Sequence, residues 1–277
     1  MAEPARFIDI HSHSTASDGQ YPPAAVASRA AAAGLRVWGL TDHDTVAGLE
    51  TARAEATRLG MRFVPGIELS CFLDRREVHI LGHFIDPVHR TLRDFEDLLA
   101  EKRRVRIGEM VTKLAALGLH VSEEAVRSFS GGKTFGRPHV ARALVQTGAV
   151  ATVKEAFDRY LGEGKPAYVQ RYRLEAQDAV RLVRGAGGVA TLAHPGVNRI
   201  EKGDAARLRA MGLDGLEVDH PEHGPSQREK FRRMAEACGL VPTGGSDFHG
   251  EAISPDRFIG AEGMAEEQLA LLEARRP

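Results

Sequence analysis

Short apolar runs that end in a histidine or a carboxylate alternate with helical segments along most of this chain, and this alternation limits the folds it can adopt. The runs that predict strands are 6–11, 37–43, 62–69, 77–84, 188–194, 214–220 and 241–247. The patterns that predict helices between them are 22–34, 45–60, 175–187 and 225–239, and the first two end at Gly34 and Gly60. Strands that alternate with helices are typical of parallel βα units.

One stretch, 98–173, interrupts this alternation. Its helix-like segments are 98–117, 138–147 and 152–160, and its only strand-like segment is 168–172. We therefore expect an inserted, mostly helical module at 98–173 and a strand–helix body built from 1–97 and 174–277. Residues 101–173 carry 14 Lys and Arg against 7 Asp and Glu, although the whole chain has a net charge of −1. A basic module on an acidic body suits an anionic substrate, and a solvated helical face would give the same excess of positive charge.

The composition is that of a globular protein, with 43% hydrophobic and 27% charged residues in 277. No run approaches the ~20 apolar residues that a membrane-spanning helix needs. The first residues lack the charged and apolar regions of a signal peptide. Cys71 and Cys238 are expected to be reduced thiols. We therefore expect a cytoplasmic protein without a membrane segment, and no motif indicates an obligate protein partner.

Nearly every predicted strand ends in, or carries, an imidazole or carboxylate group. The residues are His11, His13, Asp18, His43, Glu68, His79, His194, Asp247 and His249. Residues two apart on a strand point to the same side, so the two pairs with that spacing can each face one ion. Strand ends of a (β/α) barrel converge on one face, where packed carboxylates and imidazoles without a cation would be unfavourable. The pattern therefore predicts a cluster of divalent metal ions.

Nine ligands exceed the four to six that one metal binds, so we expect two or three ions. Glu68, with two oxygens, is the natural bridging ligand. Mixed imidazole and carboxylate ligands favour Mn²⁺, with Fe or Zn as the other candidates.

The motifs HSHSTASDG, TDHDT, PGIELS, HILGH, AHPG and GSDFHG together resemble the polymerase-and-histidinol-phosphatase (PHP) superfamily. The resemblance covers about residues 7 to 250 and implies a distorted seven-stranded (β/α)7 barrel with the helical module inserted. It also implies three metal sites. Their ligands would be His11, His13, Glu68 and Asp247 for the first, Glu68, His79 and His194 for the second, and Asp18, His43 and His249 for the third.

The segments GRPHVARAL at 136–144 and AFDRYLGEGKPAYV at 156–169 narrow this resemblance. They are similar to the branch that contains nucleoside 3′,5′-bisphosphate phosphatases and RNase AM-type 5′→3′ exoribonucleases, in which the inserted module covers the active site. The resemblance implies a nucleotide substrate, or a short RNA with a 5′-phosphate. Guanidinium groups bind phosphate through two parallel hydrogen bonds, so Arg137 and Arg171, with His139 beside them, are candidate substrate-binding residues. Each could instead have only a structural or surface role.

The expected chemistry is attack on phosphorus by a hydroxide that bridges two metals, because metals ~3.5–4 Å apart lower the pKa of a shared water. The expected reaction removes the 3′-phosphate of a nucleoside 3′,5′-bisphosphate. His220 and His223 are candidate proton donors to the leaving group. Asp42 and Asp44 are expected to orient metal ligands, although Asp44 could instead cap a helix.

Three alternatives remain open from the sequence. The substrate could be another phosphomonoester such as histidinol phosphate. The chain could be an amidohydrolase that cleaves a C–N bond, but such barrels commonly bridge their metals with a carboxylated lysine, and no lysine ends a predicted strand. It could also be a non-catalytic, metal-stabilised module that binds nucleic acid. His83 is expected to be structural.

Overall fold

The computed structural model describes residues 7–129 and 136–277, and it divides into two compact units. The first unit comprises Met1–Arg93 and Leu174–Pro277, and the second comprises Asp94–Arg173. None of the helices in the described ranges is long and apolar enough to cross a membrane.

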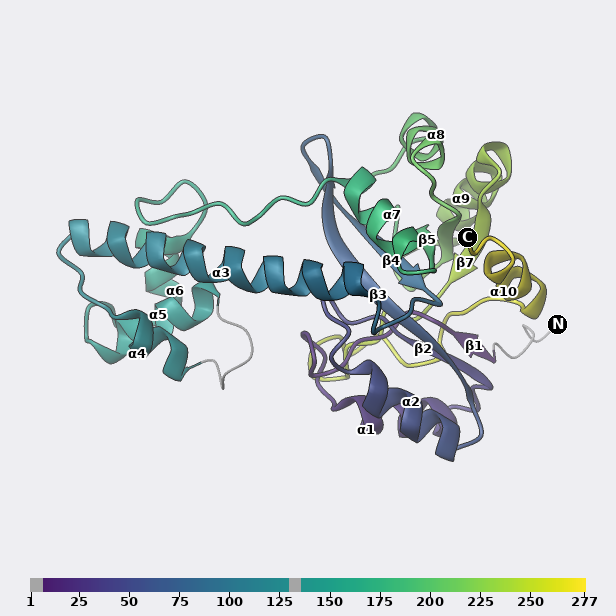
Figure 1. Cartoon of the computed structure of the whole chain (residues 1–277), viewed down its shortest axis with the longest axis horizontal. Coiled ribbons are helices and arrows are strands. Elements are labelled where there is room, and N and C mark those ends of the chain that lie inside the picture. The colour runs from purple at the N-terminus through teal and green to yellow at the C-terminus, as the bar shows by residue number, and fades with distance from the viewer. Residues whose placement is uncertain (1–6, 130–135) are drawn as a thin grey trace. The chain divides into compact units, whose positions relative to one another are not determined.

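A seven-stranded sheet forms the centre of the first unit, with its strands in chain order from β1 to β7 (Figure 1). The strands are β1 (Ile8–Asp9), β2 (Val37–Leu40), β3 (Arg62–Leu73), β4 (Arg76–His83), β5 (Val189–Leu192), β6 (Gly215–Asp219) and β7 (Val241–Gly244). Each coincides with one of the seven predicted runs. The predicted seven-stranded α/β barrel is therefore confirmed.

The sheet almost closes on itself, because the segments that follow β1 and β7 are hydrogen-bonded to each other. The Asp247 amide donates to the His11 carbonyl at 2.9 Å, and the His13 amide donates to the Phe248 carbonyl at 2.8 Å. Ser12 and Phe248 form a parallel bridge. These bonds place the residues after both strands at the same end of the barrel.

The expected pattern of parallel βα units does not extend to β4, which runs antiparallel to both β3 and β5. Only Asp74 and Arg75 separate β3 from β4. A parallel connection needs a crossover of a dozen or more residues, so a linker this short can only form a hairpin. The reversal places His79, near the start of β4, opposite Ser70, near the C-terminal end of β3.

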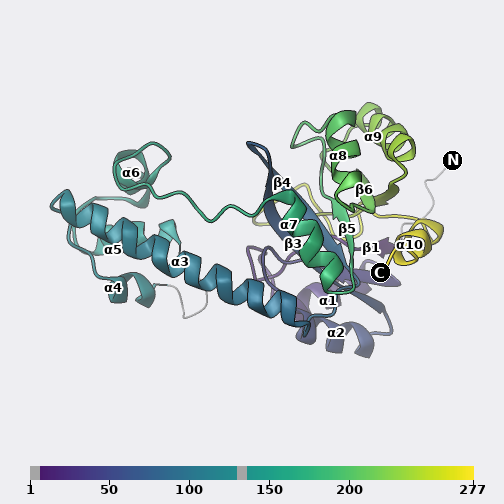
Figure 2. The same ribbon diagram turned by 45° about the horizontal axis from the view of Figure 1, so that its top comes forward.

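Helices cover the sheet of the first unit. They are α1 (Pro23–Ala32), α2 (Leu49–Arg58), α7 (Ala176–Gly185), α8 (Lys202–Ala210), α9 (Pro225–Cys238) and α10 (Glu266–Glu273). Figures 1 and 2 both show α1 beside α2 and α8 beside α9. Prolines at the first turns of α1 and α9, where no backbone donor is lost, favour those starts. The motifs of the sequence did not predict α8 or α10.

The second unit is helical and has its own hydrophobic core. It contains most of α3 (Arg90–Ala116), followed by α4 (Glu123–Ser128), α5 (Arg137–Gln146), α6 (Val153–Ala156) and the π-helical turn η1 (Phe157–Leu161). Met110, Leu114, Val140 and Leu144 are fully buried in its core. The strand-like segment 168–172 is not in a strand, so that prediction is wrong. Its backbone is held in part by side chains of α3, since Lys113 donates to the Tyr168 carbonyl and Arg106 to that of Val169.

Candidate metal centre

The nine predicted metal ligands all lie in the first unit, at or near the ends of its strands. His11 and His13 follow β1, His43 follows β2, and Glu68 and His79 lie within the β3–β4 hairpin. His194 follows β5, and Asp247 and His249 follow β7. The donor atoms of eight of them, all except His194, form three groups in which all atoms lie within 4.8 Å of one another. The groups are His11, His13, Glu68 and Asp247; His43, Glu68 and His79; and His13, Asp18, His43 and His249.

The carboxylate of Glu68 lies at the centre of the cluster and is fully buried. Its Oε2 atom is 3.2 Å from His11 Nε2, 3.0 Å from His13 Nε2 and 3.4 Å from His43 Nδ1. Its Oε1 atom is 2.7 Å from His79 Nδ1 and 3.1 Å from His194 Nε2. Each oxygen therefore faces a different set of imidazoles, which is the geometry expected of a bridging ligand.

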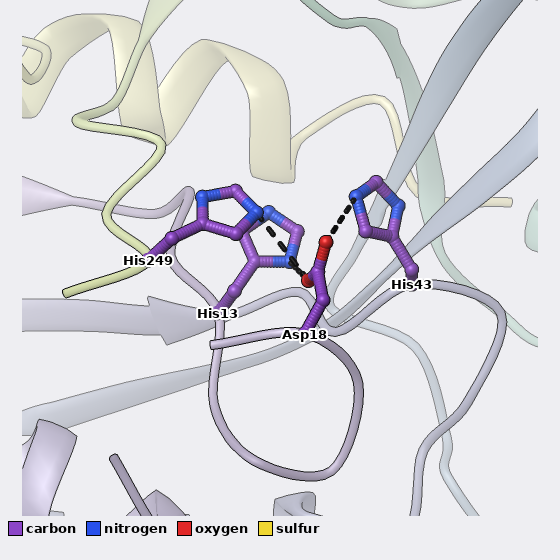
Figure 3. A group of neighbouring side chains, drawn as sticks. All are labelled: His13, Asp18, His43 and His249. Carbon is purple, nitrogen blue, oxygen red and sulfur yellow. Dashed lines mark ion pairs between the residues drawn. The ribbon is translucent and has the colours of Figure 1, made fainter. Parts of the chain in front are cut away.

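Figure 3 shows the group that contains Asp18, whose carboxylate lies between the rings of His249 and His43. Asp18 Oδ1 is 3.4 Å from His249 Nε2 and 3.8 Å from His13 Nδ1, and Oδ2 is 3.9 Å from His43 Nε2. The Asp18 side chain is 57% exposed, whereas that of His13 is completely buried. This edge of the cluster is therefore the one that solvent can reach.

The hydrogen bonding of the cluster is incomplete in the way that a metal site requires. The Nδ1 atoms of His13 and His43 are buried without a hydrogen-bond partner in the described chain. Buried polar atoms are rarely left so, because each costs about 1–3 kcal/mol. The donor set of imidazole nitrogens and carboxylate oxygens also suits a divalent transition metal. The cluster can therefore hold metal ions.

Without a cation, these side chains perturb one another strongly. Burial alone would lower the pKa of His13, but the nearby carboxylates of Asp247 and Glu68 raise this pKa to about 9. Burial also opposes the charge of His79, but Glu68 and Glu77 raise the pKa of His79 to about 10. Burial dominates at His43 and lowers its pKa to about 4. The neighbouring imidazoles hold the pKa of Glu68 well below its usual range despite burial.

Three of the imidazoles present the same nitrogen to the cluster. The Nδ1 atom of His11 lies 2.8 Å from Glu217 Oε1, that of His194 lies 3.2 Å from Asn198 Oδ1, and that of His249 lies 2.9 Å from the Asp247 carbonyl oxygen. These oxygens only accept hydrogen bonds, so each Nδ1 is the protonated donor and each Nε2 is left for coordination.

Several residues of this centre were not among the predicted site residues. Glu217 and Asn198 contact ligand imidazoles as described above, and Asp9 accepts hydrogen bonds from the amides of His11 and Ser246. Arg257 donates to the carboxylates of Asp247 and Glu222. Only Glu217 and Asp9 left a signal in the sequence, since each is a carboxylate inside an otherwise apolar strand.

The two aspartates that flank His43 act on backbone segments. The carboxylate of Asp42 accepts hydrogen bonds from Ser14 and from the Ser17 hydroxyl at 2.6–2.7 Å, which orders the loop that carries Asp18. Asp44 has a positive φ of 54° and accepts from the Ser70 amide at 3.0 Å. The alternative in which Asp44 caps a helix is wrong, because α2 begins only at Leu49.

His220 and His223 are both buried, and their nitrogens have hydrogen-bond partners. His220 donates from Nε2 to Asp247 Oδ2 at 3.3 Å, and its Nδ1 accepts from the Glu222 amide. His223 donates to the Val218 carbonyl at 2.9 Å and accepts from the Gly196 amide at 3.1 Å. These bonds give both histidines supporting roles and leave the predicted proton-donor role without geometric support.

The three predicted substrate-binding residues lie in the second unit. Arg137 begins α5, and its guanidinium is 5.7 Å from the ring centre of Phe157 and 5.6 Å from that of Tyr168. His139 Nδ1 accepts from the Gly136 amide at 3.0 Å, and burial lowers the pKa of His139. Burial, together with the charges of Arg137 and Arg171, lowers the pKa of Arg106. Three guanidinium groups therefore lie near one another in this unit.

His83 is buried in β4, and neither of its ring nitrogens has a hydrogen-bond partner within the described ranges. Burial lowers its pKa to about 3, so the imidazole is neutral at physiological pH. It belongs to none of the three groups of potential metal ligands.

Comparison with known proteins agrees with the motifs. Residues 9–179 match the PHP domain family. The chain is 38% identical over 247 residues to a 3′,5′-nucleoside bisphosphate phosphatase from Chromobacterium violaceum, with 87% of each chain covered. It is 36% identical over 248 residues to a 5′-3′ exoribonuclease from Haemophilus influenzae, with 87% of this chain and 89% of that protein covered.

Two solved structures have the same fold over nearly the whole chain. A protein from Bifidobacterium adolescentis, assigned as a metal-dependent phosphoesterase, has a TM-score of 0.77 and 30% identity and covers 100% of this chain and 98% of its own. A protein from Chromobacterium violaceum, described as an amidohydrolase with bound sulfate, has a TM-score of 0.73 and 35% identity. The match covers 97% of this chain and 96% of that protein. The chain therefore belongs to the PHP domain family, as its motifs predicted, and is a metal-dependent hydrolase.

Proposed function

We propose that this protein is a phosphatase that removes the 3′-phosphate from nucleoside 3′,5′-bisphosphates, for example converting adenosine 3′,5′-bisphosphate to AMP and phosphate. The observation that carries the proposal is the Glu68 carboxylate, whose two oxygens face separate sets of imidazoles in a buried cluster. The phosphatase from Chromobacterium violaceum, with 38% identity over most of both chains, supports the substrate.

The proposed cofactor is two or three divalent ions, with Mn²⁺ as the first candidate and Fe or Zn as the others. The proposed ligands are the nine predicted residues. They are His11, His13, Glu68 and Asp247 for the first ion, Glu68, His79 and His194 for the second, and Asp18, His43 and His249 for the third. When bound, such ions supply Lewis acidity toward the phosphoryl group and lower the pKa of a water molecule.

The chain's own residues would hold these parts in place. Glu68 and Asp247 supply negative charge to the buried side of the cluster, and His220 fixes Asp247 through its Oδ2 atom. Asp42 orders the loop that places Asp18 at the exposed edge, where substrate would enter. In the proposed module 98–173, Arg137 and Arg171 with His139 would bind the second phosphate of the substrate.

A second activity is also proposed, which is removal of 5′-terminal nucleotides from short RNA. The exoribonuclease from Haemophilus influenzae, at 36% identity, supports it. Both activities use a ribose phosphate ester next to another phosphate, so one site could serve both.

The other candidates have less support. The solved structure from Chromobacterium violaceum that is described as an amidohydrolase favours cleavage of a C–N bond. However, none of the described strands β1 to β7 contains a lysine that could be carboxylated, and Glu68 is the proposed bridging ligand. Histidinol phosphate lacks the second phosphate that a cluster of guanidinium groups would bind.

The deciding experiment uses the Mn²⁺-loaded enzyme and measures phosphate release from adenosine 3′,5′-bisphosphate and histidinol phosphate, and mononucleotide release from a 5′-phosphorylated dinucleotide. The proposal predicts that the bisphosphate gives the highest kcat/KM and that AMP is the product. Adenosine 3′-phosphate as product, or faster turnover of histidinol phosphate, would contradict it. Faster cleavage of the dinucleotide would make the exoribonuclease the principal activity.

We propose the cytoplasm as the compartment. Cys71 and Cys238 are both free thiols, and burial raises the pKa of Cys71 so that it stays protonated.

A further inference from the structure

Glu217 is a carboxylate buried in the middle of β6, where its relative exposure is 1%. Its neighbours along the strand, Leu216 and Val218, are completely buried and apolar. A charged group in such a place is costly unless both of its oxygens are satisfied. The contacts of its two oxygens therefore indicate why the sheet tolerates it.

One oxygen of Glu217 determines which ring nitrogen of His11 carries the proton. Glu217 Oε1 is 2.8 Å from Nδ1 of His11, and the other nitrogen of that ring, Nε2, is 3.2 Å from Glu68 Oε2. A carboxylate at Nδ1 requires the proton there, so Nε2 presents its lone pair to the metal cluster. The same hydrogen bond also fixes the plane of the ring.

The other oxygen of Glu217 holds the backbone of a second proposed ligand. Glu217 Oε2 accepts a hydrogen bond from the His194 amide at 2.7 Å. His194 has a φ of 27°, a conformation that residues other than glycine rarely adopt and that costs about 1–3 kcal/mol. A charge-assisted hydrogen bond at this amide helps the backbone to keep a turn that directs the imidazole toward Glu68 Oε1, 3.1 Å away.

The two imidazoles therefore lie between two carboxylates. The rings of His11 and His194 are stacked, with centres 6.0 Å apart and planes inclined by 26°. On one side both Nε2 atoms face Glu68, and on the other side Glu217 holds one ring directly and the other through its backbone. Glu68 and Glu217 therefore each hydrogen-bond to both His11 and His194.

We propose that Glu217 is a positioning residue that sets two metal ligands from different strands, His11 by its tautomer and His194 by its backbone, and so determines the metal affinity of the centre. The inference rests on the metal-binding part of the proposed function. It does not require Glu217 to touch either metal or substrate.

The test replaces Glu217 by glutamine and measures Mn²⁺ affinity by titration calorimetry. A glutamine side chain at this position can accept only one of the two hydrogen bonds, because its amide nitrogen is a donor. Loss of such a contact typically weakens metal binding about 10- to 100-fold, and this is the expected result for Glu217→Gln. The matched control is Asp214→Asn, which neutralises another buried carboxylate just before β6 that binds Arg184 and the Ala190 amide. The control should keep the wild-type Mn²⁺ affinity even if it loses stability.

A second measurement on the wild-type protein does not depend on whether the variant folds. In the ¹⁵N-labelled, Zn²⁺-loaded protein, long-range ¹⁵N–¹H correlation spectra should show His11 protonated at Nδ1 and coordinated through Nε2. Coordination through Nδ1 would overturn the proposal. So would a folded Glu217→Gln protein with wild-type Mn²⁺ affinity. A wild-type protein that binds no divalent metal would overturn both this inference and the proposed function, so the two failures can be told apart.

Discussion

Lowering the pH from 8 to 6 should weaken the binding of divalent metal to this centre steeply, because protons and metal compete for the same imidazole nitrogens. In the metal-free protein the pKa of His13 is about 9 and that of His79 is about 10, so both imidazoles carry a second proton at pH 7. Each must lose that proton before it can coordinate. The carboxylates of Glu217, Asp247 and Glu68 also raise the pKa of His11 well above its usual value despite burial, so at least two protons are released when the cluster is filled near neutral pH.

The magnitude follows from this count. Each released proton changes the apparent association constant about tenfold per pH unit below the pKa concerned. Two protons give about 100-fold per unit, or about 10⁴-fold between pH 8 and 6. Each factor of ten corresponds to about 1.4 kcal/mol.

Titration calorimetry with Mn²⁺ in buffers of different ionisation enthalpy measures both the affinity and the number of protons released. At pH 7 we expect release of at least about two protons, and an affinity that rises with pH. A histidine of the second unit supplies the control, since His120→Gln should change neither quantity. Release of less than one proton, or affinity that does not depend on pH, would refute the assignment of His13 and His79 as neutral ligands.

Three other predictions concern stability and substrate binding. Raising the pH of the metal-free protein from 7 to 10 should lower its urea unfolding midpoint. The pKa values of His13 and His79 are higher in the folded than in the unfolded protein, so the stabilisation from these protonated imidazoles is lost as the pH rises through 9 and 10. A midpoint that rises with pH would contradict this. Trp38→Ala should lower the free energy of unfolding by about 3–5 kcal/mol, because Trp38 is fully buried and its Nε1 donates to Ser12 Oγ. Urea denaturation measures this loss. A loss below about 1 kcal/mol would contradict the prediction and show that neighbouring side chains fill the cavity. Arg137→Ala should raise KM for adenosine 3′,5′-bisphosphate at least tenfold, as expected when a charge-assisted hydrogen bond worth about 1.5–3 kcal/mol is lost. The KM for 4-nitrophenyl phosphate should stay unchanged. Steady-state kinetics measures both values, and an equal increase for the two substrates would contradict the prediction.

The sequence predicted the seven strands well because each of them is a short apolar run with a clear end. The cluster could be predicted for the same reason, since the ends of neighbouring strands must meet in a barrel. The direction of β4 was missed although the two-residue linker Asp74–Arg75 excludes a parallel connection. The linker length was therefore a usable signal.

Other features could not be predicted, because they depend on contacts between distant segments. Asn198 holds His194 from four residues away in a turn, and asparagine in a turn has many other uses. Tertiary packing also determines the hydrogen-bond partners of His220 and His223. The burial of these two histidines could not be predicted, because they lie in a polar stretch of the sequence. Proposed roles for Arg137, His139 and Arg171 came from motif similarity, and local structure alone does not identify a phosphate site.

The reversed direction of β4 has a consequence for how such an enzyme can diversify. Because β4 and β5 are antiparallel neighbours, the end of one lies beside the start of the other, with His83 opposite Val189. A tight turn would be enough to join them, and no strand pairing of the described residues depends on the long excursion Asp94–Arg173. Such a connection can be lengthened, shortened or exchanged between homologues while the hydrogen-bonded barrel persists. Recombination at this junction would allow new substrates to be recruited to an unchanged reaction centre.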